Sequence, residues 1–287
     1  MQELVSFLQN HERLTQSIDT QKYEICYRGL GENWWDNSPT IFRNNNLRLE
    51  KNYIEEVVRH FPNDFSEART VDILTQIQHY DGETRMMDVT FNPLVALFFA
   101  CGGWQQIYDN KGYNSLLSKH GCVRVYKVPK ENIKSINSET VTVLSNIARL
   151  KDGDDFGQLP WLCERDWGVW QSDDDQIVQN AKDANDVFLV KTKLNNPRVM
   201  AQSGGFFLFG GLSGIEGITD PKFLRKAKIK KTAIKLPSHY IVGDLPISAS
   251  DKSALLKNLA QVNISFNTLC PEKADFIRSY LKTIKNR

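Results

Sequence analysis

The stretch QIQHYDGETRMMDVTFNPLVALFFACGG, residues 76–103, places polar side chains directly before a long apolar run. TRMMDVT has the length of a β-strand. The pair Asn92-Pro93 is typical of a helix N-cap followed by proline at the first helical position, so residues 94–101 are predicted to form a buried helix. The polar residues therefore lie on a strand and at the entrance of the following helix. Backbone N–H groups at such an entrance favour an anionic ligand such as a phosphate, which predicts one wall of a ligand pocket there.

Outward from this stretch, the chain is predicted to be helical early, rich in strands in the middle and helical again at the end. PRVMAQSGGFFLFGG, residues 197–211, is typical of two short strands punctuated by glycine. We therefore expect an α+β fold, in which helices flank a central, mostly antiparallel sheet in a single mixed domain over residues 1–287. The other predicted elements are an N-terminal helix within 1–22, helices at 50–61 and 66–80, strands at 23–30, 121–129, 186–194 and 230–237, and a C-terminal helical segment at 248–287.

Composition limits the class of protein. The chain has 287 residues, of which 41% are hydrophobic, and this is enough for a proper core. Its longest apolar run, residues 93–101, is half the length of a membrane span, and its N-terminus has no signal-peptide pattern. We therefore expect a cytoplasmic protein with no membrane partner. Five scattered cysteines without a C-x-x-C pair predict reduced core residues and no metal site.

Charge is unevenly distributed along the chain, although the net charge is only +2. Residues 151–190 form an acidic segment with ten acidic and three basic side chains, whereas residues 222–235 form a basic run with seven Lys or Arg and no acid. The basic run either faces the phosphates of a nucleic-acid partner or is a solvated face beside the acidic segment, and the sequence leaves both open.

Arg28, in YRGL, is the first candidate site residue. An arginine at a strand end offers a planar fork that suits a phosphate or carboxylate, and the neighbouring Gly29 lets a ligand approach the backbone. The alternative is a structural arginine paired with a buried carboxylate, for example Asp88.

A second group of candidates lies before and within the strand of the opening stretch. Buried charges must be paired or line a cavity, so Arg85 and Asp88 are expected to satisfy one another or a ligand. His79 is a candidate general base or hydrogen-bond donor, with a purely structural histidine as the alternative. The candidate ligand-binding residues are Gly29, Gln78, Thr84, Arg85, Asp88, Thr90 and Asn92.

Gln202, in RVMAQSGGF, is the third element. Its amide can donate and accept hydrogen bonds at once, and the adjacent glycines admit a ligand. A strand amide held by backbone groups is the alternative.

Several segments together resemble FRG-domain proteins. The resemblance runs from about residue 23 to residue 282, and the family commonly has glycine at the position of Asp81 and often proline at that of Glu83. This family occurs in bacteria and phages, often in their defence neighbourhoods. The segments that carry the resemblance are YRG at 27–29, PTIFR at 39–43, QHYDGETRMMDVTFNPLVALFFA at 78–100, RVMAQSGGF at 198–206 and ISFNTLCPEKADFIRSYLK at 264–282.

The order of these motifs also resembles, more loosely, that of ADP-ribosyltransferases. This resemblance implies Arg28 on the first strand, residues 88–90 with the following helix as the second motif, and Gln202 at the last-strand position, where such enzymes usually have glutamate. It makes Arg28, His79 and Gln202 the expected catalytic residues and NAD the expected substrate.

The resemblance implies a toxin or antiviral effector that modifies nucleic acid or protein, with an antitoxin or regulator as a further partner. A non-catalytic module that binds a nucleotide or nucleic acid and an NAD hydrolase are the alternatives.

Overall fold

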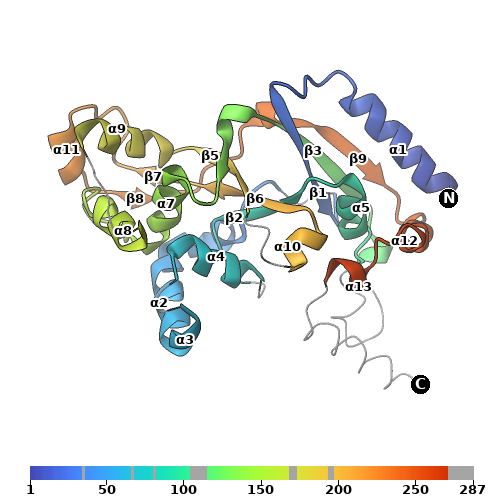
Figure 1. The fold of residues 1–287 in the computed structure, drawn as a ribbon, viewed down its shortest axis with the longest axis horizontal. Coiled ribbons are helices and arrows are strands. Elements are labelled where there is room, and N and C mark those ends of the chain that lie inside the picture. The colour runs from blue at the N-terminus through green and yellow to red at the C-terminus, as the bar shows by residue number, and fades with distance from the viewer. Residues whose placement is uncertain are drawn as a thin grey trace.

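A seven-stranded sheet organises the molecule in the computed structural model, which describes residues 1–33, 36–65, 68–79, 82–103, 115–167, 173–192 and 197–270. The strand order is β4-β5-β6-β2-β1-β3-β9. Every adjacent pair is antiparallel except β4 and β5, which are parallel. The expected α+β fold with a mostly antiparallel central sheet is therefore confirmed (Figure 1).

The strands are short and rich in β-branched and aromatic residues, which fit a pleated, half-buried surface. Two further strands form a separate small sheet. The bounds are β1 Tyr23–Leu30, β2 Met86–Thr90, β3 Gly121–Pro129, β4 Ile133–Ser135, β5 Val187–Lys191, β6 Gly204–Phe209 and β9 Ile241–Ile247 in the main sheet, and β7 Leu212–Ser213 and β8 Lys230–Lys231 in the small one.

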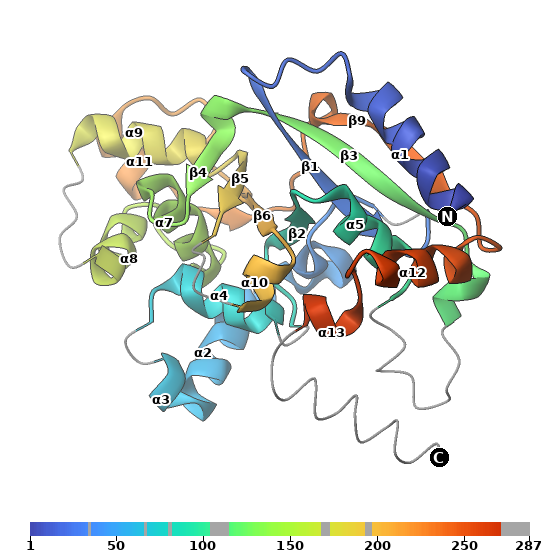
Figure 2. The same ribbon diagram turned by 45° about the vertical axis from the view of Figure 1, so that its right-hand side comes forward.

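Helices gather at both ends of the sheet, with α1, α5, α12 and α13 at one end and α2, α7, α8, α9 and α11 at the other (Figures 1 and 2). The α-helices are α1 Gln2–Thr15, α2 Glu50–His60, α3 Pro62–Phe65, α4 Thr70–His79, α5 Pro93–Ala100, α7 Glu139–Asn146, α8 Gln158–Trp167, α9 Asp174–Asp183, α10 Pro197–Ala201, α11 Pro221–Lys226, α12 Lys252–Gln261 and α13 Phe266–Leu269. The 3₁₀-helices are η1 Thr40–Leu49, η2 Ser115–Ser118, η3 Lys130–Asn132, η4 Ile147–Arg149 and η5 Ser238–Tyr240.

Successive side chains of a strand point to opposite faces of the sheet, so the core is divided between these two faces. Phe206 and Leu208 of β6 join a cluster with α2, α4 and α7, while Phe207 and Phe209 belong to a cluster on the opposite face. On the face of Phe206, a second cluster packs α1, α5 and α12 against β1, β3 and β9. Two helical cores thus share one face of the sheet, and they part near the neighbouring strands β1 and β2.

Helix α5 follows the sequence prediction closely. Asn92 is its N-cap and accepts a hydrogen bond from Leu94 N on Oδ1 at 2.9 Å, and Pro93 is its first residue. Gly29 of β1 lies against this helix, since a Cβ there would come within 2.0 Å of Ala96 O and 2.6 Å of Ala100 N. Its bare backbone therefore makes room for α5, while the expectation that Gly29 also admits a ligand stays a prediction, because this residue lines a cavity as well.

The segment 197–211 differs from the prediction of two strands. Residues 197–201 form α10, which begins with proline at a position that favours a helix start. The chain then turns through Ser203, whose φ is +47°, and enters β6. Residues 230–237 form a strand only at 230–231, in the small sheet. The predicted C-terminal helical segment at 248–287 contains α12 and α13, and its residues from 271 onward lie outside the described part of the chain.

Two expectations from composition concern the core and the membrane. All five cysteines are buried and none of them forms a disulfide, which confirms them as core residues. Within the described parts of the chain, no helix has both the length and the apolar character required to cross a membrane.

Candidate functional site

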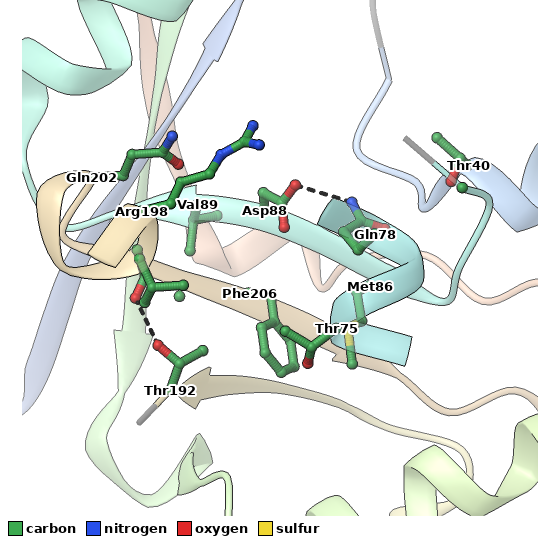
Figure 3. A pocket seen from close by; sticks show the side chains of 14 residues that line it. Thr40, Thr75, Gln78, Met86, Asp88, Val89, Thr192, Arg198, Gln202 and Phe206 are labelled. Carbon is green, nitrogen blue, oxygen red and sulfur yellow. Dashed lines mark hydrogen bonds between the residues drawn. The ribbon is translucent and has the colours of Figure 1, made fainter. Parts of the chain in front are cut away.

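Two adjoining cavities open where the helical cores part, between β2, α4 and α10 on one side and β1, η1 and α13 on the other. The larger cavity has a volume of about 510 Å³ and the smaller one about 340 Å³, both within the range of small-molecule sites. They share five lining residues, so they form one two-lobed site. Figure 3 shows the larger cavity. The shared residues are Thr40, Asp88, Val89, Arg198 and Gln202.

The opening exists because β1 and β2 pair at a single position, Tyr27 opposite Thr90. Beyond that pair, the Arg28 side chain joins the two strands, since its Nη1 donates to the backbone carbonyl of Asp88 at 2.5 Å. Arg28 therefore lies at the mouth of the gap and lines the smaller cavity.

Asp88 is exposed on the central strand β2 and is held by a short hydrogen-bond chain. Its Oδ2 accepts a hydrogen bond from Gln78 Nε2 at 3.0 Å, as Figure 3 shows, and Gln78 Oε1 in turn accepts one from the Thr84 hydroxyl. Thr84 Oγ1 also accepts a hydrogen bond from Met86 N at 3.1 Å, so its own proton is available for Gln78. Thr84 thereby fixes which end of the Gln78 amide faces Asp88.

Thr84 is thus a positioning residue: it lines neither cavity, whereas Gln78 lines the larger one and Asp88 lines both. Thr84 was one of the ligand-binding residues predicted from the sequence, and the structure gives it this indirect position instead.

Three arginines line the smaller cavity: Arg28, Arg43 and Arg198. Burial lowers the pKa of Arg28 and the nearby Arg43 charge lowers it further, while Tyr126 and Asp88 oppose the shift. Arg43 Nη2 donates to Ser38 O at 3.0 Å and lies 3.4 Å from Asp36 Oδ1. Arg43 and Arg198 lie in two of the segments that resemble FRG-domain proteins, but neither residue was predicted from the sequence to belong to the site. Only the fold shows that η1 and α10 meet at this gap.

Arg85 does not belong to the site, and the expected pair with Asp88 is wrong. Its guanidinium is fully buried and contacts Glu50 through two hydrogen bonds, Nε to Oε1 at 2.8 Å and Nη2 to Oε2 at 2.5 Å. Lys231 Nζ lies 3.0 Å from Glu50 Oε2, which completes a buried ionic triad. Arg85 lines neither cavity, because its side chain points into the core under η1 and α2 instead.

Gln202 lies at both cavities, but in the turn after α10 and not on a strand, which corrects its assignment to the last strand. Its Nε2 donates to the backbone carbonyl of Leu269 at 3.1 Å and so ties the turn to α13. Thr90 lines the smaller cavity and donates to the backbone carbonyl of Gln202 at 2.6 Å.

Two other candidates contribute no described group to the cavities. Asn92 lines neither of them, and its carboxamide caps α5. His79 ends α4, but its side chain lies outside the described part of the structure.

The basic run at 222–235 lies beside the acidic segment. Arg225 contacts Asp174 at 3.1 Å and Lys228 contacts Asp155 at 3.0 Å, while Lys231 belongs to the buried triad. This favours the second of the two interpretations, a solvated face next to acidic residues. A nucleic-acid contact of the remaining basic residues stays a prediction.

Comparison with known families identifies the segment that builds much of this site. Residues 23–107 match the family model of the FRG domain. The chain contains an FRG domain. The matched FRG segment begins with β1, extends beyond α5 and includes Arg28, Arg43 and Asp88. Searches of curated proteins and of solved structures gave no match. The resemblance of residues 198–206 and 264–282 to FRG-domain proteins stays a prediction, since the matched segment ends before them.

Proposed function

We propose that the two-lobed cavity binds NAD and that the protein is an ADP-ribosyltransferase-like enzyme. The observation that carries the proposal is the meeting of Arg28 and Asp88 at the gap between β1 and β2. A cationic fork and a held carboxylate at one point suit a ligand that carries phosphates beside a reacting sugar.

Cleavage of NAD requires a positive group that binds the phosphates and a negative group near the reacting ribose. In NAD the bond between ribose C1′ and the nicotinamide nitrogen breaks, and its electron pair leaves with nicotinamide. Positive charge then develops on the ribose, and a carboxylate nearby stabilises it in the transition state. The acceptor's nucleophilic atom bonds to C1′ and loses its proton. We assign the stabilising carboxylate to Asp88.

We choose Asp88 over Glu32 and Glu83, two other carboxylates of the FRG segment, because neither of them lines a cavity. Glu83 accepts a hydrogen bond from Asn46 at 2.7 Å and lines neither cavity, and Glu32 is likewise absent from both linings. Gln202 offers an amide, which orients a ligand but cannot act as a base at neutral pH. Asp88 is the single carboxylate among the described lining residues of either cavity.

The acceptor distinguishes the transferase from its rivals. Nucleic acid or protein as acceptor fits a bacterial or phage toxin or antiviral effector, as the FRG resemblance implies, whereas water as acceptor makes the protein an NAD hydrolase. A non-catalytic nucleotide-binding module is the alternative from a different class. It is favoured by one observation, that Gln202 Nε2 donates to the backbone carbonyl of Leu269, so this amide group already has a structural role.

The test is incubation of the purified protein with NAD labelled in its adenylate part, in separate pools of DNA, RNA and cell protein, with release of nicotinamide measured in parallel. The matched variants are Asp88→Asn and Asp175→Asn, because Asp175 is exposed on α9, far from the cavity lining. We expect label in one pool, its loss in Asp88→Asn and its retention in Asp175→Asn.

Each other outcome points to a rival. Free ADP-ribose without labelled macromolecule identifies a hydrolase. NAD binding by a folded protein, with neither label nor nicotinamide, identifies the binding module. Full activity of Asp88→Asn contradicts the role given to Asp88.

A further inference from the structure

Two buried donors in the wall of the smaller cavity have no acceptor among the described residues. They are the Nε atoms of Arg28 and Arg43. Both arginines line this cavity, one from β1 and the other from η1. A buried N–H without a partner destabilises the folded protein, so two such groups in one cavity wall indicate a ligand that accepts from them.

The charges of the cavity wall point to an anion. The described lining has three arginines against one carboxylate, that of Asp88, whose Oδ2 is already bonded to Gln78. Asp36 contacts Arg43 from outside the lining, at 3.4 Å, and within the described part of the chain the Arg28 guanidinium donates to a backbone carbonyl, not to a carboxylate. Burial and the neighbouring Arg43 both disfavour the charge of Arg28, which a bound anion would offset.

The fold holds Arg43 in place through the segment that also positions Asp88. Thr84 N donates to Thr40 Oγ1 at 3.3 Å, and Ile41 N donates to Thr84 O at 3.3 Å. These bonds fix the start of η1, and thus Arg43, beside the gap at β1. The fold therefore sets the position of Arg43 in the wall that it shares with Arg28.

We infer that the smaller cavity is a phosphate subsite in which Arg28 and Arg43 together bind the phosphate groups of a nucleotide. Guanidinium groups suit this ligand because their planar N–H donors match phosphate oxygens. The inference deepens the proposed function and rests on it for the nucleotide. It assigns Arg43 a binding role, and it places the phosphates in the lobe beside β1 and the rest of the nucleotide in the lobe beside α4.

The experiment compares ADP, adenosine and inorganic pyrophosphate as probes by isothermal titration calorimetry at low salt. The proteins are the wild type, Arg43→Gln and the matched control Arg59→Gln, whose arginine is exposed on α2 and pairs with Glu56 on that helix. Both variants lose one positive charge, so a change found only in Arg43→Gln is local. Arg28→Lys is the second site variant, because it retains a positive charge and removes the planar fork.

We expect the wild type to bind ADP more tightly than adenosine and to bind pyrophosphate alone. One charge-assisted hydrogen bond of about 1.5–3 kcal/mol corresponds to roughly ten- to hundredfold in affinity. Arg43→Gln should therefore lose about tenfold or more for ADP and pyrophosphate, with adenosine unchanged. Arg28→Lys should shift the same two probes, and Arg59→Gln none.

Equal affinity of the wild type for ADP and adenosine would overturn the inference, and so would equal losses for adenosine and ADP in Arg43→Gln. These outcomes are separable from failure of the proposed function. Phosphate-dependent binding that needs Arg43, in a protein that leaves NAD intact, supports the subsite and contradicts the transferase. NAD turnover that is unchanged in Arg43→Gln and is not inhibited by pyrophosphate supports the transferase and contradicts the subsite.

Discussion

Replacing Glu50 with glutamine should destabilise the protein strongly. Glu50 is 1% exposed and is the carboxylate of the buried triad, where it faces two cations, Arg85 and Lys231. The isosteric amide keeps the volume but removes the negative charge, so both cations are left buried without a counter-charge. Breaking a buried ion pair in this way costs about 3–5 kcal/mol, a large part of the 5–15 kcal/mol by which domains are typically stable.

The assay is urea unfolding followed by circular dichroism, with the free energy of unfolding extrapolated to water. Glu56→Gln is the matched control, because Glu56 forms an exposed ion pair with Arg59 on the same helix, and its loss should leave the free energy of unfolding nearly unchanged. An equal, small effect of both substitutions would refute the reasoning that burial makes the triad decisive.

The same carboxylate predicts a dependence of stability on pH. Burial raises the pKa of Glu50, but Arg85 and Lys231 outweigh it and hold the pKa below the ordinary 4.5. A carboxyl whose pKa is lowered on folding stabilises the protein above its unfolded-state pKa and loses that contribution as the pH falls through the folded-state value. The stability advantage of the wild type over Glu50→Gln should therefore shrink below about pH 4.5 in urea unfolding repeated across pH.

Three further predictions concern the site and its supports. Gly29→Ala should cost about 1–3 kcal/mol or more in thermal unfolding because its Cβ meets α5, whereas Gly204→Ala, with 3.6 Å of clearance, should be tolerated; equal midpoints would contradict this. Asn92→Ala should cost about 1 kcal/mol through loss of the α5 cap, measured the same way. Thr84→Val should weaken NAD binding in calorimetry because the Gln78 amide loses its fixed orientation, and Thr84→Ser should restore it; unchanged affinity in Thr84→Val would show that the chain to Asp88 is dispensable.

Features encoded by local sequence were predictable. Asn92-Pro93 predicts the start of α5, because an N-cap and a first-turn proline are local signals that lie next to each other in the sequence. The strand β2 is likewise predicted from its own short segment. The five-residue helix α10 was mistaken for a strand, because a helix so short shows no apolar period.

Long-range pairing was not predictable. Arg85 and Asp88 are close in sequence, yet Arg85 pairs with Glu50, and the third member of the triad, Lys231, lies 181 residues from Glu50. No local sequence pattern predicts an ion pair between residues so far apart in the chain. The same limit applies to Arg43, because its place beside Arg28 depends on how η1 attaches to the segment before β2.

The single backbone pair between β1 and β2 has a mechanical consequence. The seven-stranded sheet consists of two ribbons, β4-β5-β6-β2 and β1-β3-β9, and its weakest seam is the one that carries the cavities. Arg28 bridges this seam with one side-chain hydrogen bond. A molecule bound between Arg28 and Asp88 would add contacts across the same seam. Ligand binding is therefore expected to increase the rigidity of the sheet. Protection of the β1 and β2 amides from hydrogen exchange is therefore a direct report of whether the site is filled.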